Sequence, residues 1–333
     1  MTTFGDQVRQ YGGVPVGVDR LATIFNKDNI WFVDQMNGAT AHGGQKPDDA
    51  FALPSEAVSA ATAEGIIYIR PAWTIASADA HYDDNITIPV TKPLIQLIGA
   101  GAGTVPGYRG SAQIQPASAT SHIISVDAAG VVIENLHLNN TGGGTGYCCV
   151  EARRETGSQA VALQVRNCRI INTTSGVGDT GTSIQGAIGL GTTQYCVIEN
   201  NIFLDCYNSI TMWATGGSPQ NYTIRGNIIA GKPSNRSTDI MIGMTADTCI
   251  GHSIIGNYFC DGLPDAGGYN MFIYDFYSGT SSATGIISGN HFPTLTGNAF
   301  DGSQCTLSAG WFFTGNYYDG VDSVAGYGLG TKD

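Results

Sequence analysis

The stretch CVIENNIF at residues 196–203 is one copy of a block that recurs from the middle of the chain to near its end. Each copy has an apolar pair, a polar residue, Asn or Gly-Asn, and then a second apolar run. The other copies are VVIENLHL (131–138), LQVRNCRI (163–170), YTIRGNII (222–229), SIIGNYF (253–259), GIISGNHF (285–292) and WFFTGNYY (311–318). Such self-similarity is typical of a repeat protein, in which each copy belongs to one structural unit.

The period of these blocks indicates a parallel β-helix. One position is equivalent in every copy, and successive copies are separated by 32, 33, 26, 30, 33 and 26 residues. The equivalent residues are Asn135, Asn167, Asn200, Gly226, Gly256, Gly289 and Gly315. Propeller blades are longer, and leucine-rich repeats show a Leu ladder that is missing here. One coil cannot bury its own apolar face, so coils stack about 4.8 Å apart and complete one another's backbone hydrogen bonds.

The Asn or Gly of each block marks a sharp turn between two strands. Gly, and less often Asn, tolerates the positive φ that such corners require. Asn side chains at the same corner of successive coils can also form a ladder of amide hydrogen bonds. We expect that ladder to contain Asn135, Asn167, Asn200, Asn227, Asn257, Asn290 and Asn316.

A second strand is expected between consecutive blocks. The segments are CCVEA (148–152), SIQGAIGL (183–190), SITMWA (209–214), DIMIGM (239–244) and MFIYDF (271–276). The connections at 172–182, 230–238 and 261–270 are rich in Gly, Ser, Asn and Asp, which predicts loops that protrude from the helix.

The chain divides into three parts. Residues 1–30 are expected to form an extended arm that packs on another molecule, and the β-helix is expected over 31–320. A solenoid needs a cap over its first coil, and the Ala-rich segment 55–63 predicts a short helix in that role. Residues 321–333 are a Gly-rich C-terminal tail or cap.

Charge is scarce and mostly negative. Charged residues make up 13% of the 333 residues, and the formal net charge is −12. An acidic chain lacks the basic footprint of a nucleic-acid binder and does not suit an anionic membrane surface. We see no secretory signal and no apolar run near the ~18 residues of a membrane helix. We therefore expect synthesis in the cytoplasm, with no nucleic-acid or membrane partner.

Cysteines and histidines give no sign of a metal or cofactor. The eight cysteines mostly lie in or beside apolar runs, where a free thiol behaves as a small buried hydrophobe. No CxxC pair has a matching second pair, and the six histidines lack metal-ligand spacing. We expect no cofactor.

The opening of the chain resembles the phage pectate-lyase-like superfamily, which has the pectin lyase fold. The resemblance rests on IWFVDQMNG (30–38), DDAF (48–51), the Ala-rich helix and IIYIRP (66–71), and with the repeats it covers about residues 28–320. It implies an all-β protein with a single-stranded right-handed parallel β-helix. Relatives of this kind are tailspikes, capsid decorations and polysaccharide-cleaving enzymes, usually trimers, so the resemblance transfers fold more safely than activity.

An enzyme on this scaffold needs acids that adjacent coils bring together. A glycoside hydrolase uses two carboxylates about 5 Å apart for retention or about 6.5–9.5 Å apart for inversion. A lyase needs a base and often calcium held by carboxylates. We call equivalent positions of successive coils a station. Along the second strand, the residues expected near one station are Glu151, Gly186 or Ala187, Trp213, Ile242 and Tyr274. This set contains no carboxylate pair, so the sequence favours a role without catalysis.

Other side chains are kept as candidates. Should the chain be an enzyme, Asp239 and Asp275 are the acids and Arg154 is the anion binder. The candidate glycan-binding residues are Trp213, Tyr274 and Tyr277. Aromatic rings can stack on sugars, although they also fill cores and contacts between protomers. The alternating residues Glu134, Arg166, Glu199 and Arg225 indicate a solvated salt-bridge ladder.

Two functions remain open. The favoured one is a structural protein of the virion surface, a trimeric β-helix spike that serves as a capsid decoration or head fibre. Its partners are copies of itself, capsid or tail proteins and, as a further possibility, a host-surface polysaccharide. The anchoring residues predicted in the arm are Phe4, Tyr11, Gly12, Gly13, Val14 and Pro15. The alternative is a tailspike depolymerase, whose carboxylate pair must come from loops or from two protomers.

Overall fold

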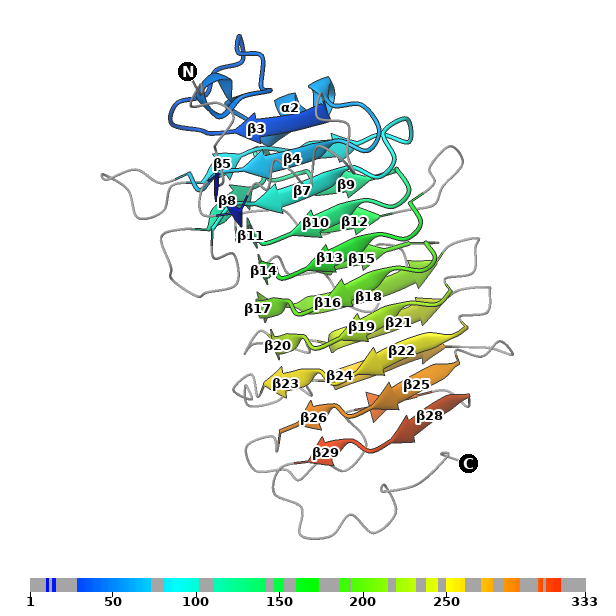
Figure 1. Ribbon diagram of the computed structural model, residues 1–333. Helices are drawn as coiled ribbons and strands as arrows, with labels where there is room; N and C mark the ends of the chain where they lie inside the picture. Colours follow the sequence, from blue (N-terminus) through cyan, green and yellow to red (C-terminus); the bar gives the residue numbers. More distant parts are fainter. Residues whose placement is uncertain are drawn as a thin grey trace.

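Three parallel sheets run the length of the molecule and enclose one core (Figure 1). The structure is a computed structural model. It describes residues 10–11, 14–15, 29–72, 81–101, 111–141, 147–152, 160–173, 186–191, 193–214, 220–231, 238–244, 250–260, 271–277, 284–293, 305–307 and 310–318.

Each sheet takes one strand from each coil. The first sheet contains β3 (Ile30–Val33), β4 (Ile66–Ile69), β7 (Gln96–Gly99), β10 (Val132–Glu134), β13 (Gln164–Arg166), β16 (Val197–Glu199), β19 (Thr223–Arg225), β22 (His252–Ile255), β25 (Gly285–Ser288) and β28 (Trp311–Thr314). The second contains β5 (Tyr82–Asp83), β8 (Ala112–Gln115), β11 (Leu136–Asn140), β14 (Arg169–Asn172), β17 (Ile202–Cys206), β20 (Ile228–Gly231), β23 (Tyr258–Cys260), β26 (His291–Phe292) and β29 (Tyr317–Tyr318). The third contains β6 (Ile86–Ile88), β9 (Ile124–Val126), β12 (Val150–Ala152), β15 (Ile188–Leu190), β18 (Asn208–Ala214), β21 (Thr238–Met244), β24 (Met271–Tyr277) and β27 (Cys305–Thr306).

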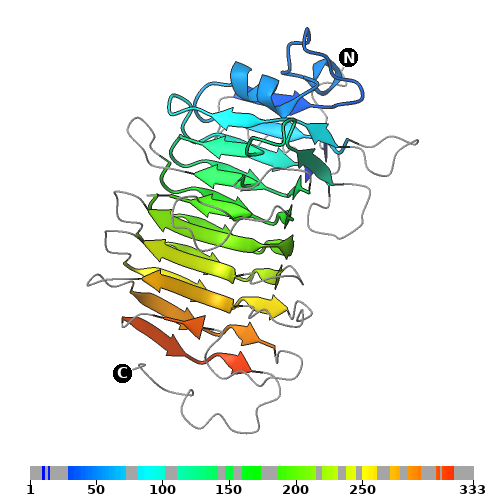
Figure 2. The ribbon, with the colours of Figure 1, turned by 180° about the vertical axis from the view of Figure 1, so that it is seen from behind.

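The chain passes from the first sheet to the second and the third before the next coil begins. A typical coil is formed by β10, β11 and β12. The coils descend with a right-handed sense in Figure 1, and Figure 2 shows the same stack from behind. The predicted right-handed parallel β-helix is therefore confirmed.

The core consists of columns of apolar side chains, with one side chain from each coil. One column of the first sheet contains Ile133, Val165, Ile198, Ile224, Ile254 and Ile287, all of them fully buried. Burying one such side chain contributes about 1.5–3 kcal/mol. Because the column is continuous, each coil covers the apolar face of its neighbours.

The predicted corner positions are confirmed by the backbone angles. Asn135, Asn167 and Asn200 have φ between 54° and 58°. Gly226, Gly256, Gly289 and Gly315 have φ between 61° and 63°. All of these corners therefore use the left-handed region, which only Gly and Asn enter readily.

The predicted asparagine ladder is confirmed for Asn227, Asn257, Asn290 and Asn316 and is wrong for its three N-terminal members. The ladder lies one residue after the corner and contains Asn201, Asn227, Asn257, Asn290 and Asn316. Asn257 Oδ1 accepts hydrogen bonds from the backbone N–H of Asn227 at 3.0 Å and from its Nδ2 at 2.9 Å. Asn135, Asn167 and Asn200 instead occupy the corner itself, because their short amide side chains tolerate positive φ.

A short helix lies at the N-terminal end of the stack (Figure 1). This helix, α2 (Pro54–Ala60), packs on β3, β4 and β6 and follows a 3₁₀ turn, η3 (Pro47–Asp49). Glu56 accepts hydrogen bonds from the backbone N–H groups of Ala52 and Leu53, both at 3.1 Å. The helix ends before the predicted boundary at residue 63, because Ala61 is extended.

The predicted arm is described only in part. Gln10–Tyr11 (β1) and Val14–Pro15 (β2) form an antiparallel pair, and the first strand of the β-helix begins at Ile30. The backbone of three predicted anchoring residues, Tyr11, Val14 and Pro15, belongs to this pair. Phe4, Gly12, Gly13 and residues 321–333 lie outside the described residues.

Candidate functional site

The column of the third sheet that contains Glu151 differs from the predicted one. Its members are Thr87, Ser125, Glu151, Gly189, Thr211, Met241, Tyr274 and Thr306. The prediction was right for Glu151 and Tyr274 and wrong for the residues between them. Trp213 lies two residues beyond Thr211 on the same strand, and Ile242 is fully buried in the core. Loop lengths differ from coil to coil, so the register could not be counted from the repeated blocks.

Glu151 of this column pairs with a histidine of the preceding coil. Glu151 Oε2 lies 3.0 Å from His122 Nε2, and the two side chains are only 12% and 16% exposed. The backbone N–H of Cys148 donates to His122 Nδ1 at 2.9 Å. Because Nδ1 accepts this bond, a neutral His122 carries its proton on Nε2 and donates it to Glu151. The edge of one ring faces the other in the contact between Tyr147 and His122, with centroids 5.3 Å apart.

This pair can bind a hydroxyl group or transfer a proton, since a half-buried carboxylate held by a histidine is fixed in one orientation. Hydrolysis by two carboxylates requires a second acid. Among the residues that the register places in the column of Glu151, Glu151 is the only Asp or Glu. The sequence did not reveal the pair, because its members come from different coils and have no motif in common.

The predicted catalytic residues do not share a station. Asp275 pairs with Ile242, whereas Asp239 directly precedes Ile240, which pairs with Ile273. The side chains of Asp239, Asp275, Trp213, Tyr274 and Tyr277 lie outside the described part of the chain, as does all of Arg154. Their catalytic and glycan-binding roles remain predictions.

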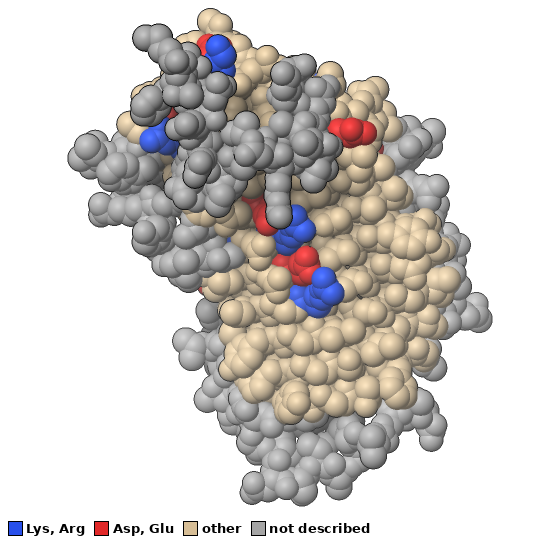
Figure 3. Space-filling model, viewed as in Figure 1, with Lys and Arg blue, Asp and Glu red and all other residues tan. Residues whose placement is uncertain are grey.

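The predicted salt-bridge ladder of the first sheet is confirmed in register. Glu134, Arg166, Glu199 and Arg225 occupy successive coils. Arg166 Nη2 lies 2.9 Å from Glu134 Oε2, and Arg225 Nη2 lies 2.6 Å from Glu199 Oε2. Figure 3 shows acidic and basic side chains alternating in one column of this face. Surface pairs of this kind contribute at most about 1 kcal/mol each, so the ladder is a solvated surface feature.

Below the ladder lies a face without charge, which we call the charge-free face (Figure 3). It is the outer side of β20, β22, β23, β25, β26, β28 and β29, whose residues include no Asp, Glu, Lys or Arg. Of the eleven large hydrophobic residues exposed in the described part of the chain, seven lie on this face or at its edge. They are Ile228, Ile250, Ile255, Tyr258, Ile286, Phe312 and Tyr317.

The aromatic rings of the charge-free face are stacked along the helix axis. The rings of Tyr258 and His291 are nearly parallel, with an angle of 2° and centroids 4.4 Å apart. Tyr317 follows them in the same column. A sugar stacks on the open face of an aromatic ring, and here the facing sides of Tyr258 and His291 cover each other. The column therefore suits packing against a protein surface better than binding a glycan.

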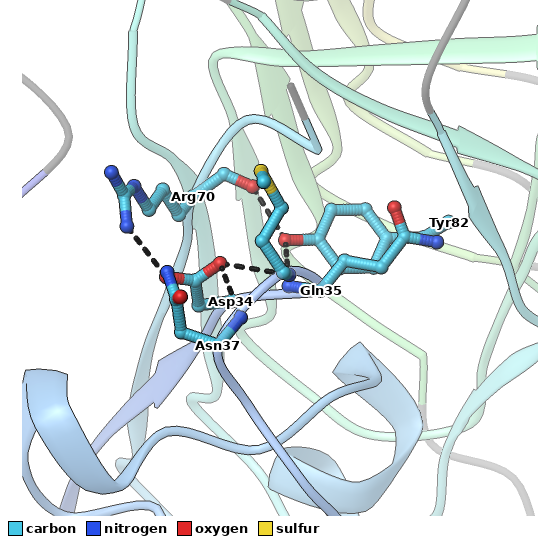
Figure 4. Close-up of polar contacts among 6 residues, drawn as sticks. Asp34, Gln35, Asn37, Arg70 and Tyr82 are labelled. Carbon is cyan, nitrogen blue, oxygen red and sulfur yellow. Dashed lines mark hydrogen bonds and ion pairs between the residues drawn. The ribbon is translucent and has the colours of Figure 1, made fainter. Parts of the chain in front are cut away.

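A third polar network joins the opening strands to the second sheet (Figure 4). Asp34 accepts hydrogen bonds from Arg70 Nη1 at 2.6 Å and from Asn37 Nδ2 at 3.0 Å. The buried Tyr82 hydroxyl donates to the carbonyl of Arg70 at 2.6 Å and accepts from the backbone of Gln35. Burial alone raises the pKa of Asp34, but these hydrogen bonds hold the pKa below its ordinary value. The partners are satisfied within the fold, so we assign this network to holding the N-terminal end together.

Thiols and metal ligands add no further site in the described part of the chain. Its cysteines are free, and most are buried in the core, as the sequence predicted. Burial raises the pKa of Cys168 to about 12, so this thiol is unreactive. No group of three or more His, Cys, Asp or Glu residues there could hold a metal ion. None of the helices described is long and apolar enough to cross a membrane.

Comparisons with known proteins concern the fold. Neither a family model nor a curated protein matches the sequence. A pectin methylesterase from carrot superposes with a TM-score of 0.50 at 14% identity, over 91% of this chain and 86% of its own. The pectin methylesterase PemA of Erwinia chrysanthemi gives 0.47 at 11% identity, over 90% and 92%. A DFA-IIIase from Arthrobacter chlorophenolicus gives 0.43 at 13%, over 87% and 81%. The chain thus has the right-handed β-helix of the pectin lyase fold, and likeness at this identity does not transfer an activity.

Proposed function

We propose that this chain is a structural protein of a phage virion surface, a β-helix spike that assembles as a homotrimer through the charge-free face. The observation that carries the proposal is that face itself. Contiguous exposed apolar surface on a soluble protein marks an interaction site. A chain with a net charge of −12 repels its own copies, and this face offers no charge to repel or to desolvate. An uncharged apolar face is complementary to itself, so a second copy is the partner that suits it.

Attachment is the second part of the proposal. Residues 1–30 hold the spike on the particle, with Phe4, Tyr11, Gly12, Gly13, Val14 and Pro15 as the anchoring contacts. The arm precedes the first coil, so the opposite end of the spike points away from the particle. We favour a capsid decoration or head fibre over a tail component, with a host-surface glycan as a further partner.

Sedimentation velocity of the full chain tests the assembly. We expect a species of three times the 34.8 kDa of one chain. Phe312 is 53% exposed on the charge-free face, and Phe312→Asp should weaken association at least tenfold. Met36 is equally exposed at the other end of the molecule, and Met36→Asp is the matched control. A monomeric wild type, or a Phe312→Asp variant that stays trimeric, contradicts the proposal.

Cryo-electron microscopy of the virion, with symmetry imposed, tests the location. Copies on the capsid lattice held by residues 1–30 support a decoration protein, and copies found only at the tail support a tail component. A chain without residues 1–30 should still form the trimer and should fail to attach to particles. Attachment without the arm contradicts the anchoring role.

A polysaccharide depolymerase is the second candidate, and the pair of His122 and Glu151 is the observation that favours it. Incubation with host capsular polysaccharide, followed by a reducing-end assay, tests this function. Loss of cleavage in Glu151→Gln, with unchanged melting temperature, would assign the activity to the pair. No cleavage by the wild type leaves the structural role as the function.

A further inference from the structure

A polar cluster lies on the outer face of the second sheet, on a different side of the helix from Glu151. Leu136 and Leu138 of β11 are fully buried in the core. Side chains alternate along a strand, so His137 and Asn139 project outward. The register places Gln113, His137 and Arg169 side by side on three successive coils, about 4.8 Å apart. We call His137, Asn139 and Arg169 the second-sheet cluster.

Three polar atoms of the second-sheet cluster are buried without a hydrogen-bond partner. They are His137 Nε2, Asn139 Oδ1 and Arg169 Nε. His137 is only 6% exposed although it projects from the sheet. Leaving a buried donor or acceptor unpaired is costly, and native proteins leave few of them. Three such atoms on adjacent strands indicate a place that a ligand completes.

The charge of Arg169 defines one part of that ligand. Within the described part of the chain, Arg169 forms no ion pair. Burial lowers the pKa of its guanidinium, and the charge of Asp205 opposes that shift without coming within ion-pair distance. A half-buried guanidinium with open donors matches a carboxylate, which it can bind through two parallel hydrogen bonds.

His137 Nε2 and Asn139 Oδ1 define the remaining, uncharged part of the ligand. Burial and the nearby charge of Arg169 lower the pKa of His137 to about 4, so its imidazole is neutral near pH 7. Asn139 Oδ1 only accepts hydrogen bonds, so it requires a donor. A hydroxyl group supplies both a donor and an acceptor. Sulfate, which carries no O–H near pH 7, leaves Asn139 without a donor, and a neutral sugar leaves Arg169 without a counter-charge.

We propose that the second-sheet cluster binds a hydroxy acid, with the carboxylate on Arg169 and a neighbouring hydroxyl on His137 and Asn139. This chemistry is shared by free hydroxy acids and by the uronic acid units of an acidic glycan. The glycan rests on the virion function proposed above, whereas the binding chemistry does not. Gln113, Asn139 and Arg169 are partly exposed, so the rim of the cluster meets solvent, while its three unpaired atoms are covered.

Isothermal titration of the full chain with sodium glucuronate, glucose and an oligoglucuronate tests the site. We expect glucuronate to bind at least tenfold more tightly than glucose. Arg169→Gln should reduce glucuronate affinity at least tenfold, and Asn139→Leu should reduce it severalfold. Arg225→Gln is the control, because Arg225 is an exposed arginine of the ladder, and it should bind as the wild type does. Tighter binding of the oligomer than of the monomer identifies a glycan, and equal binding identifies a free hydroxy acid.

Two results overturn the proposal. One is equal affinity of the wild type for glucose and glucuronate, including no binding of either. The other is wild-type affinity in both Arg169→Gln and Asn139→Leu, with thermal melting showing that each variant folds. The assembly test is independent, since Phe312→Asp should keep the site and Arg169→Gln should keep the trimer.

Discussion

The two halves of the β-helix have the same backbone conformation at their corners but use different residues there. In the N-terminal half, the corners are Asn135, Asn167 and Asn200, and the residue after the corner is Leu136 or Cys168 in the first two coils. In the C-terminal half, the corners are glycines. The residue after them is the asparagine of the ladder, at Asn227, Asn257, Asn290 and Asn316. The same corner φ is therefore compatible with either an apolar residue or an asparagine at the next, buried position.

The outer surfaces of the two halves also differ, because one is charged and polar and the other carries no charge. The N-terminal half carries the salt-bridge ladder and the second-sheet cluster, whereas the C-terminal half carries the charge-free face (Figure 3). The residue after the corner is apolar at Leu136 and Cys168, whereas the amide ladder begins at Asn201 and continues under the charge-free face. The backbone hydrogen bonds between coils are common to both, so the outer surface is free to serve separate partners.

Breaking the amide ladder should have the largest effect on stability. Asn257 Nδ2 donates to the Ile224 carbonyl at 3.0 Å and to Asn290 Oδ1 at 2.9 Å, while its oxygen accepts from Asn227. Asn257→Ala leaves several buried groups unpaired, each costing about 1–3 kcal/mol. We expect a loss of about 4 kcal/mol in the free energy of unfolding, measured by urea denaturation followed by circular dichroism.

Cys168→Ala is the matched control in the other half, because Cys168 occupies the same station. Its backbone N–H donates to Asn201 Oδ1 at 2.9 Å and keeps that bond after substitution. We expect a loss of about 1 kcal/mol, the size of a small apolar truncation. Equal losses in the two variants would show that the ladder contributes no more than ordinary packing.

Acid should destabilise both halves through one buried histidine in each. Burial lowers the pKa of His252 to about 4, and burial together with the charge of Arg169 lowers that of His137 to about 4. In the unfolded chain the value is about 6.5, so above this pH both states are neutral and stability is unaffected. Between about 6.5 and 4 the unfolded chain binds protons that the folded chain does not, and stability falls. We expect a loss approaching 3 kcal/mol per histidine by pH 4.

Urea midpoints at pH 7.5 and pH 4.5 measure this effect. His252→Gln and His137→Gln should each remove about half of the difference between the two midpoints. A pH dependence that both substitutions leave unchanged would place the acid sensitivity on other groups.

The fold could be predicted because its signal repeats. Corner residues such as Asn200 and Gly226 recur at coil spacing, and the apolar residues around them alternate with the period of a strand. Membership of the ladder could not be predicted, since Asn200 and Asn201 are adjacent and equally polar. Only the backbone shows that Asn200 takes the left-handed conformation and that Asn201 points into the core.

The candidate sites were less predictable for a related reason. The stations of Glu134 and Arg166 could be counted from the repeated blocks, and their register was correct. The third sheet follows loops of variable length, so Trp213 was assigned to a station that Thr211 holds. His122 lies two residues before β9, and Glu151 lies on the neighbouring strand β12, so their contact depends on the register of the third sheet and no local sequence pattern encodes it.

The smallest effects should come from exchanging the corner types. A Cβ added at Gly226 lies 2.6 Å from Asn200 Oδ1, whereas one added at Gly256 meets nothing within 4 Å. Gly256→Ala should therefore lower the free energy of unfolding by about 1 kcal/mol, because only positive φ opposes it. Gly226→Ala should lower it by about 2 kcal/mol, because Asn200 must also move. Gly256→Asn, which turns a corner of the C-terminal half into one of the N-terminal type, should cost less than about 0.5 kcal/mol, since Asn tolerates this region. Urea midpoints rank the three variants. If Gly256→Asn were as costly as Gly256→Ala, the asparagine corners of the N-terminal half would need a reason other than φ, such as the hydrogen bond from Asn135 Nδ2 to the Gly99 carbonyl at 2.7 Å.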